Sequence, residues 1–307
     1  MLTTAQPLPP GGARCVELAQ PNYVNFVFSI FILLGILVSY LPQHLRIINR
    51  KSSFGLSPYF VLLGTTSGTC QFANILTLPG SRADMACCRE VSGFACFAGL
   101  LGVMQVGMQW TCFAVILFLF LIYFPRATPS TPNPAKDADE QPSFRTAVIV
   151  AWICVAHAFV TGVISIYFTL ARPGSLQSWA NFLGILSTVL AVIQYFPQIW
   201  TTFVLKRVAS LSIPMMCIQT PGSFVWAASL ASRLGTQGWS AWGVYVVTGC
   251  LQGTLLVMGV IYELRWKRKE KKELEDRLDA ANRGQAEREG RGGEVDEQTP
   301  LIRQEEE

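Results

Sequence analysis

The sequence has few charged residues, and between Glu140 and Glu263 it has no carboxylate at all. Only 14% of its 307 residues are charged, whereas 51% are hydrophobic. Soluble domains carry about 25% charged residues. So little charge cannot cover a water-exposed surface, and we therefore expect most of the chain to lie in lipid. The formal net charge of +4 is small, and no groove of alternating basic and aromatic residues is visible, so we expect no nucleic-acid partner.

Groups for catalysis are equally scarce. The chain has two histidines, and it shows no Ser-His-Asp set, paired carboxylates or metal-ligand spacing. These absences predict that the protein is not an enzyme and holds no cofactor or metal. Most of the nine cysteines lie in apolar runs, where cysteine acts as a small hydrophobic residue: Cys70, Cys96, Cys112, Cys154, Cys217 and Cys250. We predict no disulfide framework, and the state of the adjacent pair Cys87 and Cys88 stays open.

Seven apolar runs are long enough to cross a bilayer as helices of roughly 20 residues. They cover about 24–42, 57–78, 98–124, 146–170, 179–200, 213–232 and 240–262. Residues 125–145 are proline-rich and too polar to span, so they form a linker. Residues 1–22 are rich in Pro, Gly and Ala and are predicted to be disordered. Residues 263–307 form a charged tail, helical to about 283 and disordered beyond.

The distribution of Lys and Arg predicts the orientation, because cytosolic loops carry an excess of both. With seven spans, one side holds 14 basic residues: Arg46, Arg50, Lys51, Arg126, Lys136, Arg145, Lys206, Arg207 and six between Arg265 and Lys272. The other side holds five: Arg14, Arg82, Arg89, Arg172 and Arg233. The first side should be cytosolic. The N-terminus then faces the lumen, and the tail lies in the cytosol.

An internal repeat is the most informative feature. Tyr40-Leu41-Pro42-Gln43 recurs as Tyr195-Phe196-Pro197-Gln198, at an offset of 155 residues. The same offset carries Lys51 onto Lys206, Leu56 onto Leu211 and Ser57 onto Ser212. From Pro42 to Ser57 five of 16 positions are identical, where chance gives about one. Each copy lies at the cytosolic end of one span and leads into the next. The chain is therefore predicted to contain two halves of one fold.

One connecting span separates the two three-span halves, so both halves enter the membrane in the same sense. The predicted fold is all-α and membrane-embedded. Seven transmembrane helices form two parallel three-helix bundles, 23–124 and 179–262, joined by a connecting helix at 146–170. At the paired motifs the chain resembles the PQ-loop family, which includes cystinosin, vacuolar basic amino acid exporters and, more distantly, the SWEET sugar transporters. The resemblance covers about residues 24–262. It implies this fold, a central substrate path, and motif roles for Pro42, Gln43, Pro197 and Gln198.

The motif has a physical rationale. Proline lacks an N–H and clashes with the preceding turn, so inside a helix it leaves a carbonyl without its partner. In a membrane that carbonyl needs another donor, which the amide of Gln43 or Gln198 can supply. Two such kinks, one in each half, suit hinges for alternating access. The alternative is that each proline simply ends its helix at the membrane surface.

Polar residues inside spans mark pathways, because they face the interior of a bundle. The candidates for the substrate pathway are Gln71, Asn74, Gln105, Gln109, His157, Asn181 and Gln252, with Trp226 at the repeat position of Gln71. The alternative for each is a hydrogen bond between helices, worth about 0.6 kcal/mol. No Asp or Glu lies within a predicted span, which departs from cystinosin and disfavours a cationic solute.

The tail contains Glu297-Gln298-Thr299-Pro300-Leu301-Ile302. An acidic residue, three spacers and Leu301-Ile302 match the acidic dileucine signal that clathrin-adaptor complexes bind. A signal of this kind must be exposed in the cytosol, where the charge distribution places the tail. We therefore expect delivery to a vacuolar or lysosomal membrane.

These observations predict a transporter of a small polar solute, an amino acid or related compound, that works by alternating access. The partners expected are membrane lipid, that solute and the adaptor complex. A second hypothesis is a membrane receptor or adaptor that transports nothing. The KDEL receptor, a related protein, shows that this fold can bind without carrying a solute.

Overall fold

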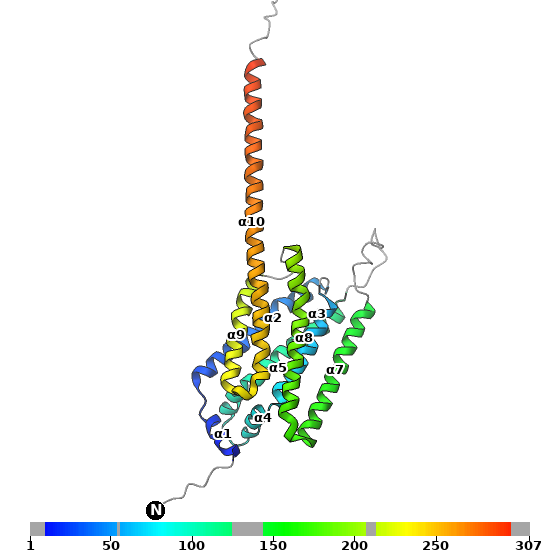
Figure 1. The fold of residues 1–307 in the computed structure, drawn as a ribbon, viewed down its shortest axis with the longest axis vertical. Coiled ribbons are helices and arrows are strands. Elements are labelled where there is room, and N and C mark those ends of the chain that lie inside the picture. The colour runs from blue at the N-terminus through cyan, green and yellow to red at the C-terminus, as the bar shows by residue number, and fades with distance from the viewer. Residues whose placement is uncertain (1–9, 54–55, 125–143, 207–212, 296–307) are drawn as a thin grey trace, which may run out of the picture.

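The computed structural model describes residues 10–53, 56–124, 144–206 and 213–295. Regular secondary structure in these ranges is entirely helical, and Figure 1 shows an elongated helical body from which one helix projects. The α-helices are α1 (Pro10–Ala19), α2 (Tyr23–Arg50), α3 (Pro58–Thr77), α4 (Pro79–Cys87), α5 (Gly93–Ile122), α7 (Phe144–Ala171), α8 (Leu176–Leu205), α9 (Ile213–Leu234) and α10 (Trp239–Val295).

Within the described residues, five helices are long and apolar enough to cross a membrane: α2, α5, α7, α8 and α10. Their outward faces carry large hydrophobic side chains such as Phe31, Trp152 and Phe159. The chain is therefore a multi-pass membrane protein. Helices α3 and α9 are less apolar. The surface of α3 is largely covered by protein, since it packs against α5, α7 and α8.

The helices pack in a repeated order. In the first half α5 lies against both α2 and α3, and in the second half α10 lies against both α8 and α9. Two seams join the halves, one between α3 and α8 and one between α2 and α9, and the first is far more extensive. Helix α7 packs mainly on α3. The repeat seen in the sequence is thus matched by equivalent neighbours in space.

The ends of the two motif-bearing helices repeat as well. Helix α2 is followed by Lys51 with φ 46°, and α8 is followed by Lys206 with φ 50°. Within the described ranges these are the two non-glycine residues with positive φ. A left-handed residue is a common way to end a helix. Because Lys51 and Lys206 are also identical at the repeat offset, the equivalence of the two halves extends to the backbone.

The N-terminal segment differs from the prediction of disorder for residues 1–22. Residues 10–19 form α1, which lies beside α4 and α5 at the end of the body opposite the projecting part of α10 (Figure 1). Two disulfides, Cys15–Cys87 and Cys88–Cys96, join this region. The prediction of no disulfide framework was therefore wrong, because Cys96 begins an apolar run in sequence yet lies next to Cys88 in space.

The charged tail also differs from the prediction. Helix α10 continues without a break to Val295, beyond the boundary expected near residue 283. Ion pairs one helical turn apart, Lys267–Glu263, Lys269–Glu273 and Lys271–Glu275, support it along an exposed surface. The linker at 125–143, residues 1–9 and the dileucine sequence at 297–302 lie outside the described residues.

Candidate functional site

The two motif prolines lie inside their helices. Pro42 lies within α2 and Pro197 within α8, and each helix continues for about two turns to Arg50 or Leu205. The alternative that proline ends each helix is therefore wrong. Both prolines are exposed on the surface of the helical body. The described residues show no hydrogen bond from the amide of Gln43 or Gln198, so the predicted pairing with the open carbonyls is not formed in this conformation.

The tyrosine two residues before each motif proline lies near the interface between the two halves. Tyr40 interacts with Gln109 of α5, and Tyr195 interacts with Gln252 of α10. In both halves the motif tyrosine thus meets a glutamine on the third helix of its own half. Tyr40 also lies near Tyr195, so the two Tyr-Gln pairs lie close to each other where the halves face each other. The sequence contained this signal, since both tyrosines are identical at the repeat offset, but only the Pro-Gln pairs were assigned a role.

Tyr245 of α10 lies beside these Tyr-Gln pairs, and together with Gln71, Gln219 and Trp226 they form what we call the central cluster. Its hydroxyl donates a hydrogen bond to Oε1 of Gln109 at 3.0 Å, and its ring stacks on Trp226 of α9 with centroids 4.0 Å apart. Gln71 of α3 lies beside the same hydroxyl and donates a hydrogen bond to the carbonyl of Ala241 at 2.6 Å. Gln252 bonds to Gln219 of α9 at 3.4 Å. The cluster therefore draws side chains from α2, α3, α5, α8, α9 and α10.

The central cluster retains hydrogen-bonding capacity. Gln71 and Trp226 are 3% and 6% exposed, yet Oε1 of Gln71 and the indole N–H of Trp226 have no partner among the described residues. A buried polar atom without a partner is costly. One acceptor on Gln71 and one donor on Trp226 therefore remain open near Tyr245. Gln71, Gln109, Trp226 and Gln252 of the predicted pathway residues belong to this cluster.

The other predicted pathway residues lie outside the central cluster, and most of them join two helices. Asn74 donates to the carbonyl of Ala180 and to Ser240 Oγ, which joins α3 to α8 and α10. Gln105 donates to the carbonyl of Ser29 at 2.9 Å and joins α5 to α2. Asn181 accepts from Gln177, one turn earlier in α8. Nε2 of His157 on α7 lies 3.3 Å from the sulfur of Cys70, on the side of α3 that contacts α7.

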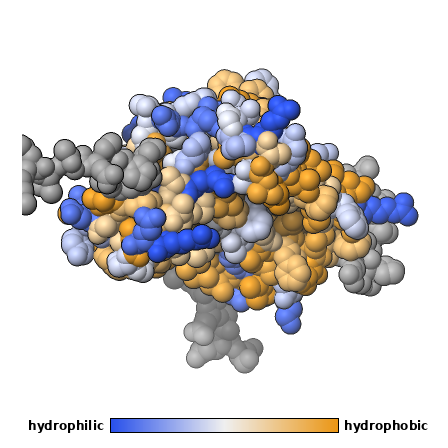
Figure 2. Space-filling model, turned by 90° about the horizontal axis from the view of Figure 1, so that it is seen from below, coloured by the Kyte–Doolittle hydropathy of each residue, from blue (hydrophilic) through white to orange (hydrophobic). Residues whose placement is uncertain are grey.

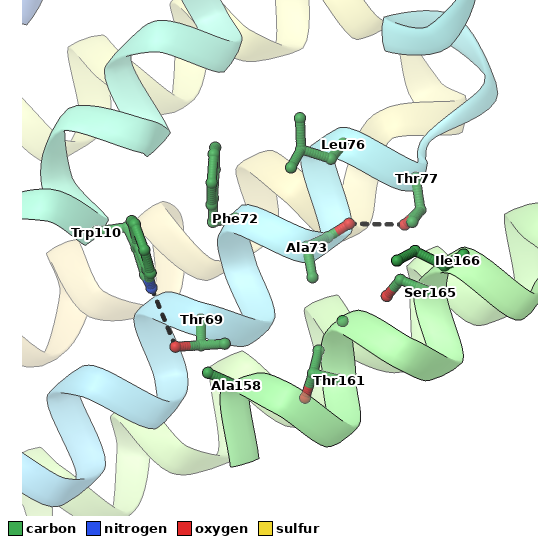
Figure 3. A pocket seen from close by; sticks show the side chains of 11 residues that line it. Thr69, Phe72, Ala73, Leu76, Thr77, Trp110, Ala158, Thr161, Ser165 and Ile166 are labelled. Atoms are coloured by element: carbon green, nitrogen blue, oxygen red, sulfur yellow. Dashed lines mark hydrogen bonds between the residues drawn. The ribbon is translucent and has the colours of Figure 1, made fainter. Parts of the chain in front are cut away.

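A cavity of about 320 Å³ lies between α3, α5 and α7 (Figure 3). Its walls include Phe72, Trp110 and the small residues Ala158 and Gly162, and the indole N–H of Trp110 is held by Thr69 Oγ1 at 3.1 Å. The lining is mainly apolar and takes nothing from α8, α9 or α10. The cavity therefore lies between the first half and the connecting helix α7, separate from the central cluster. In the described part of the chain, no three His, Cys, Asp or Glu side chains gather as metal ligands.

Comparison with known proteins finds the same family repeat in both halves. The sequence pattern of the PQ loop repeat matches residues 24–82 and 179–239, which begin 155 residues apart like the motifs. An uncharacterized protein of Schizosaccharomyces pombe is 34% identical over 256 residues, which cover 81% of this chain and 84% of that protein. The chain belongs to the PQ-loop repeat family. Both PQ-loop matches contain a motif-bearing helix and the helix that follows it.

Among solved structures, a eukaryotic SWEET transporter is similar to this PQ-loop protein. It shares 14% sequence identity and superimposes with a TM-score of 0.49. The match covers 78% of this chain and 99% of the transporter.

Proposed function

We propose that this PQ-loop protein is a membrane transporter of a small polar solute, an amino acid or related compound, that works by movement of its two halves. The observation that carries this proposal is the central cluster. The repeated tyrosines Tyr40 and Tyr195 lie there, each near a glutamine of its own half, beside an unpartnered donor and acceptor. Residues at a repeat interface suit a substrate site, because relative motion of the halves changes access to it.

The proposal includes seven spans, with α3 and α9 crossing along with the five apolar helices. The supporting argument for α3 is that it is largely covered by protein, so it needs fewer apolar residues than a lipid-facing helix. For α9 it is the repeat, which makes α9 the equivalent of α3. The N-terminus would face the lumen. The excess of Lys and Arg at the other end supports this orientation. So do the two disulfides near α1, because disulfides persist in oxidising compartments.

The chemistry of the central cluster favours a neutral or zwitterionic solute. Its functional groups are phenols, amides and an indole, and no carboxylate lies within α2, α3, α5, α7, α8 or α9. A cation entering from water would therefore lose its hydration without gaining a fixed negative partner. Amides can instead satisfy both an ammonium and a carboxylate of the same solute.

Uptake by purified protein in liposomes tests the proposal. We expect saturable uptake of a labelled amino acid, and we expect Gln109→Leu with Tyr245→Phe to reduce it at least tenfold, since two polar contacts are lost. Thr111→Val is the matched control, because Thr111 is exposed on the same helix as Gln109 and its hydroxyl donates to the carbonyl of Gly107 in that helix. The absence of flux for amino acids and sugars would reject the proposal.

A receptor or adaptor is the second candidate function. The feature that favours it is the part of α10 that projects from the body as an exposed helix, a surface available to a cytosolic partner (Figure 1). Saturable binding of a solute in the same liposome preparation, with no flux, would support this alternative.

We further propose that Glu297, Leu301 and Ile302 direct the protein to a vacuolar or lysosomal membrane through a clathrin adaptor. Leu301→Ala with Ile302→Ala should move a fluorescent fusion to the cell surface, because the two apolar contacts of the signal are removed. Thr299→Ala, in the spacer, serves as the control. Unchanged vacuolar location of the double variant, seen by microscopy, would exclude this signal.

A further inference from the structure

The end of the molecule that carries α1 and α4 holds a charged contact between the two halves. Figure 2 looks onto this end, where hydrophilic residues lie among hydrophobic ones. Arg233 in the last turn of α9 reaches across the seam to the first half. Its guanidinium donates to the carbonyl of Ala98 on α5 at 2.8 Å and to Ser29 Oγ on α2 at 2.6 Å, with Asn25 O at 3.4 Å. This one side chain therefore ties α9 to both α2 and α5.

The repeat places a different residue at the equivalent position. Subtracting the offset of 155 from Arg233 gives Leu78, at the end of α3. Leu78 is 2% exposed and packs with Ala180 of α8 and Ala241 of α10. Ala180 is itself the equivalent of Asn25, since 25 plus 155 is 180. At equivalent positions, an apolar side chain therefore packs across one seam, and a guanidinium forms hydrogen bonds across the other.

The two seams differ in how readily their helices can separate. The seam between α3 and α8 is extensive and includes the bond from Asn74 to Ala180 and the reciprocal hydrogen bonds of Ser67 on α3 and Ser187 on α8, at 2.9 and 3.0 Å. Opening it would expose Leu78 and unpair buried polar groups. The seam between α2 and α9 is small, and half-buried Arg233 can exchange its partners for water at a net cost of about 1 kcal/mol per hydrogen bond.

Helix α1 braces the weaker seam. Arg14 forms an ion pair with Asp84 of α4 at 2.8 Å and also contacts the backbone carbonyl of Arg233 at 3.5 Å. The hydrogen bond to Asp84 raises the pKa of Arg14, so its charge is permanent. The Cys15–Cys87 disulfide and the contact of Leu18 with Gly99 fix α1 to the first half. Helix α1 therefore lies across the seam, with a covalent tether on one side and a polar contact on the other.

We infer that the seam between α9 and the pair α2 and α5 is the gate on the non-cytosolic side, with Arg233 as its latch and disulfide-tethered α1 as its brace. This inference rests on the proposed transport function. The seam between α3 and α8 stays closed while the gate opens, so the motion is a hinge about that tighter seam.

Distance measurements between spin labels test the gate without requiring transport. One label pair, Val27→Cys with Ser232→Cys, reports on the gate, and a second, Pro79→Cys with Ser178→Cys, reports on the tight seam. All four positions are exposed, and exposed Cys217 and Cys250 are changed to serine. In liposomes we expect two distances for the gate pair and one for the control pair. Arg233→Leu, which copies Leu78, should leave only the short gate distance and reduce flux at least tenfold.

The role proposed for α1 predicts a partial change in the populations of the two gate distances. Cys15→Ser with Cys87→Ser should increase the population with the long gate distance, while Arg233→Lys, which keeps the charge, should retain both distances. A gate pair that shows one distance in every variant would overturn the inference, as would full flux through Arg233→Leu. If the gate pair shows both distances in the native sequence but no solute is transported, the gate stands and the transport proposal fails.

Discussion

Replacing both motif prolines by leucine should make the protein more stable and less active. Pro42 and Pro197 lie inside α2 and α8 with exposed rings, so leucine restores a backbone hydrogen bond without filling an occupied space. We expect each change to add on the order of 1–3 kcal/mol to the free energy of unfolding. The same stiffening removes both hinges, so uptake in liposomes should fall at least tenfold.

The opposite signs of the two effects make this prediction specific. Most substitutions that abolish function also lower stability, whereas this pair should raise the melting temperature. Gly35→Ala is the matched control, because it stiffens α2 outside the motif and its new methyl group has no neighbour within 4 Å. It should add up to about 1 kcal/mol and leave transport unchanged. Normal flux through the double proline variant would remove the hinge hypothesis.

Gly184→Ala should be the most destabilising small substitution in the second half. A methyl group at Gly184 would overlap the backbone carbonyl and side chain of Ser240, at the crossing of α8 and α10. A backbone atom cannot move aside as a side chain can, so the helices must separate. We expect a loss of about 2–3 kcal/mol, measured as a lower melting temperature of the purified protein.

Gly162→Ala on α7 provides the comparison. Its added methyl group meets nothing within 4 Å, so only the improved helix propensity remains, worth up to about 1 kcal/mol. The two variants should therefore shift the melting temperature in opposite directions. A similar, small shift for both would mean that α8 and α10 do not approach each other at Gly184 and Ser240.

The repeat explains why much of the fold was predictable from sequence. Apolar runs predict helices in lipid, and the offset of 155 residues predicts two equivalent halves. Both motif-bearing helices indeed end at a left-handed lysine, Lys51 and Lys206. The N-terminal helix was not predictable in this way. Cys15 and Cys87 are 72 residues apart, and their pairing depends on how α1 folds back onto α4. The continuation of α10 depends on ion pairs such as Lys271–Glu275, which composition alone does not distinguish from a disordered charged tail.

The candidate site was predictable only in part. Polarity within an apolar run identified Gln71, Gln109 and Gln252, but it identified Asn74 and Gln105 equally, and these hold helices together. Tyr245 was missed because tyrosine is common in membrane helices and has no equivalent in the first half. Spacing within one helix gives the face of a residue but not its neighbour on another helix. Which polar residues meet depends on helix packing, and only the structure supplies it.

Glycosylation mapping of inserted acceptor sites tests the central claim, a duplicated protein of seven spans, most directly. The seven-span arrangement places the turn at Arg89 and Glu90 in the lumen and residues 125–143 in the cytosol. If α3 and α9 did not cross, the five apolar helices would reverse both positions. We therefore predict that an Asn-x-Thr acceptor inserted after Glu90 is glycosylated and that the same acceptor within 125–143 is not. Glycosylation within 125–143 and none after Glu90 would contradict the account.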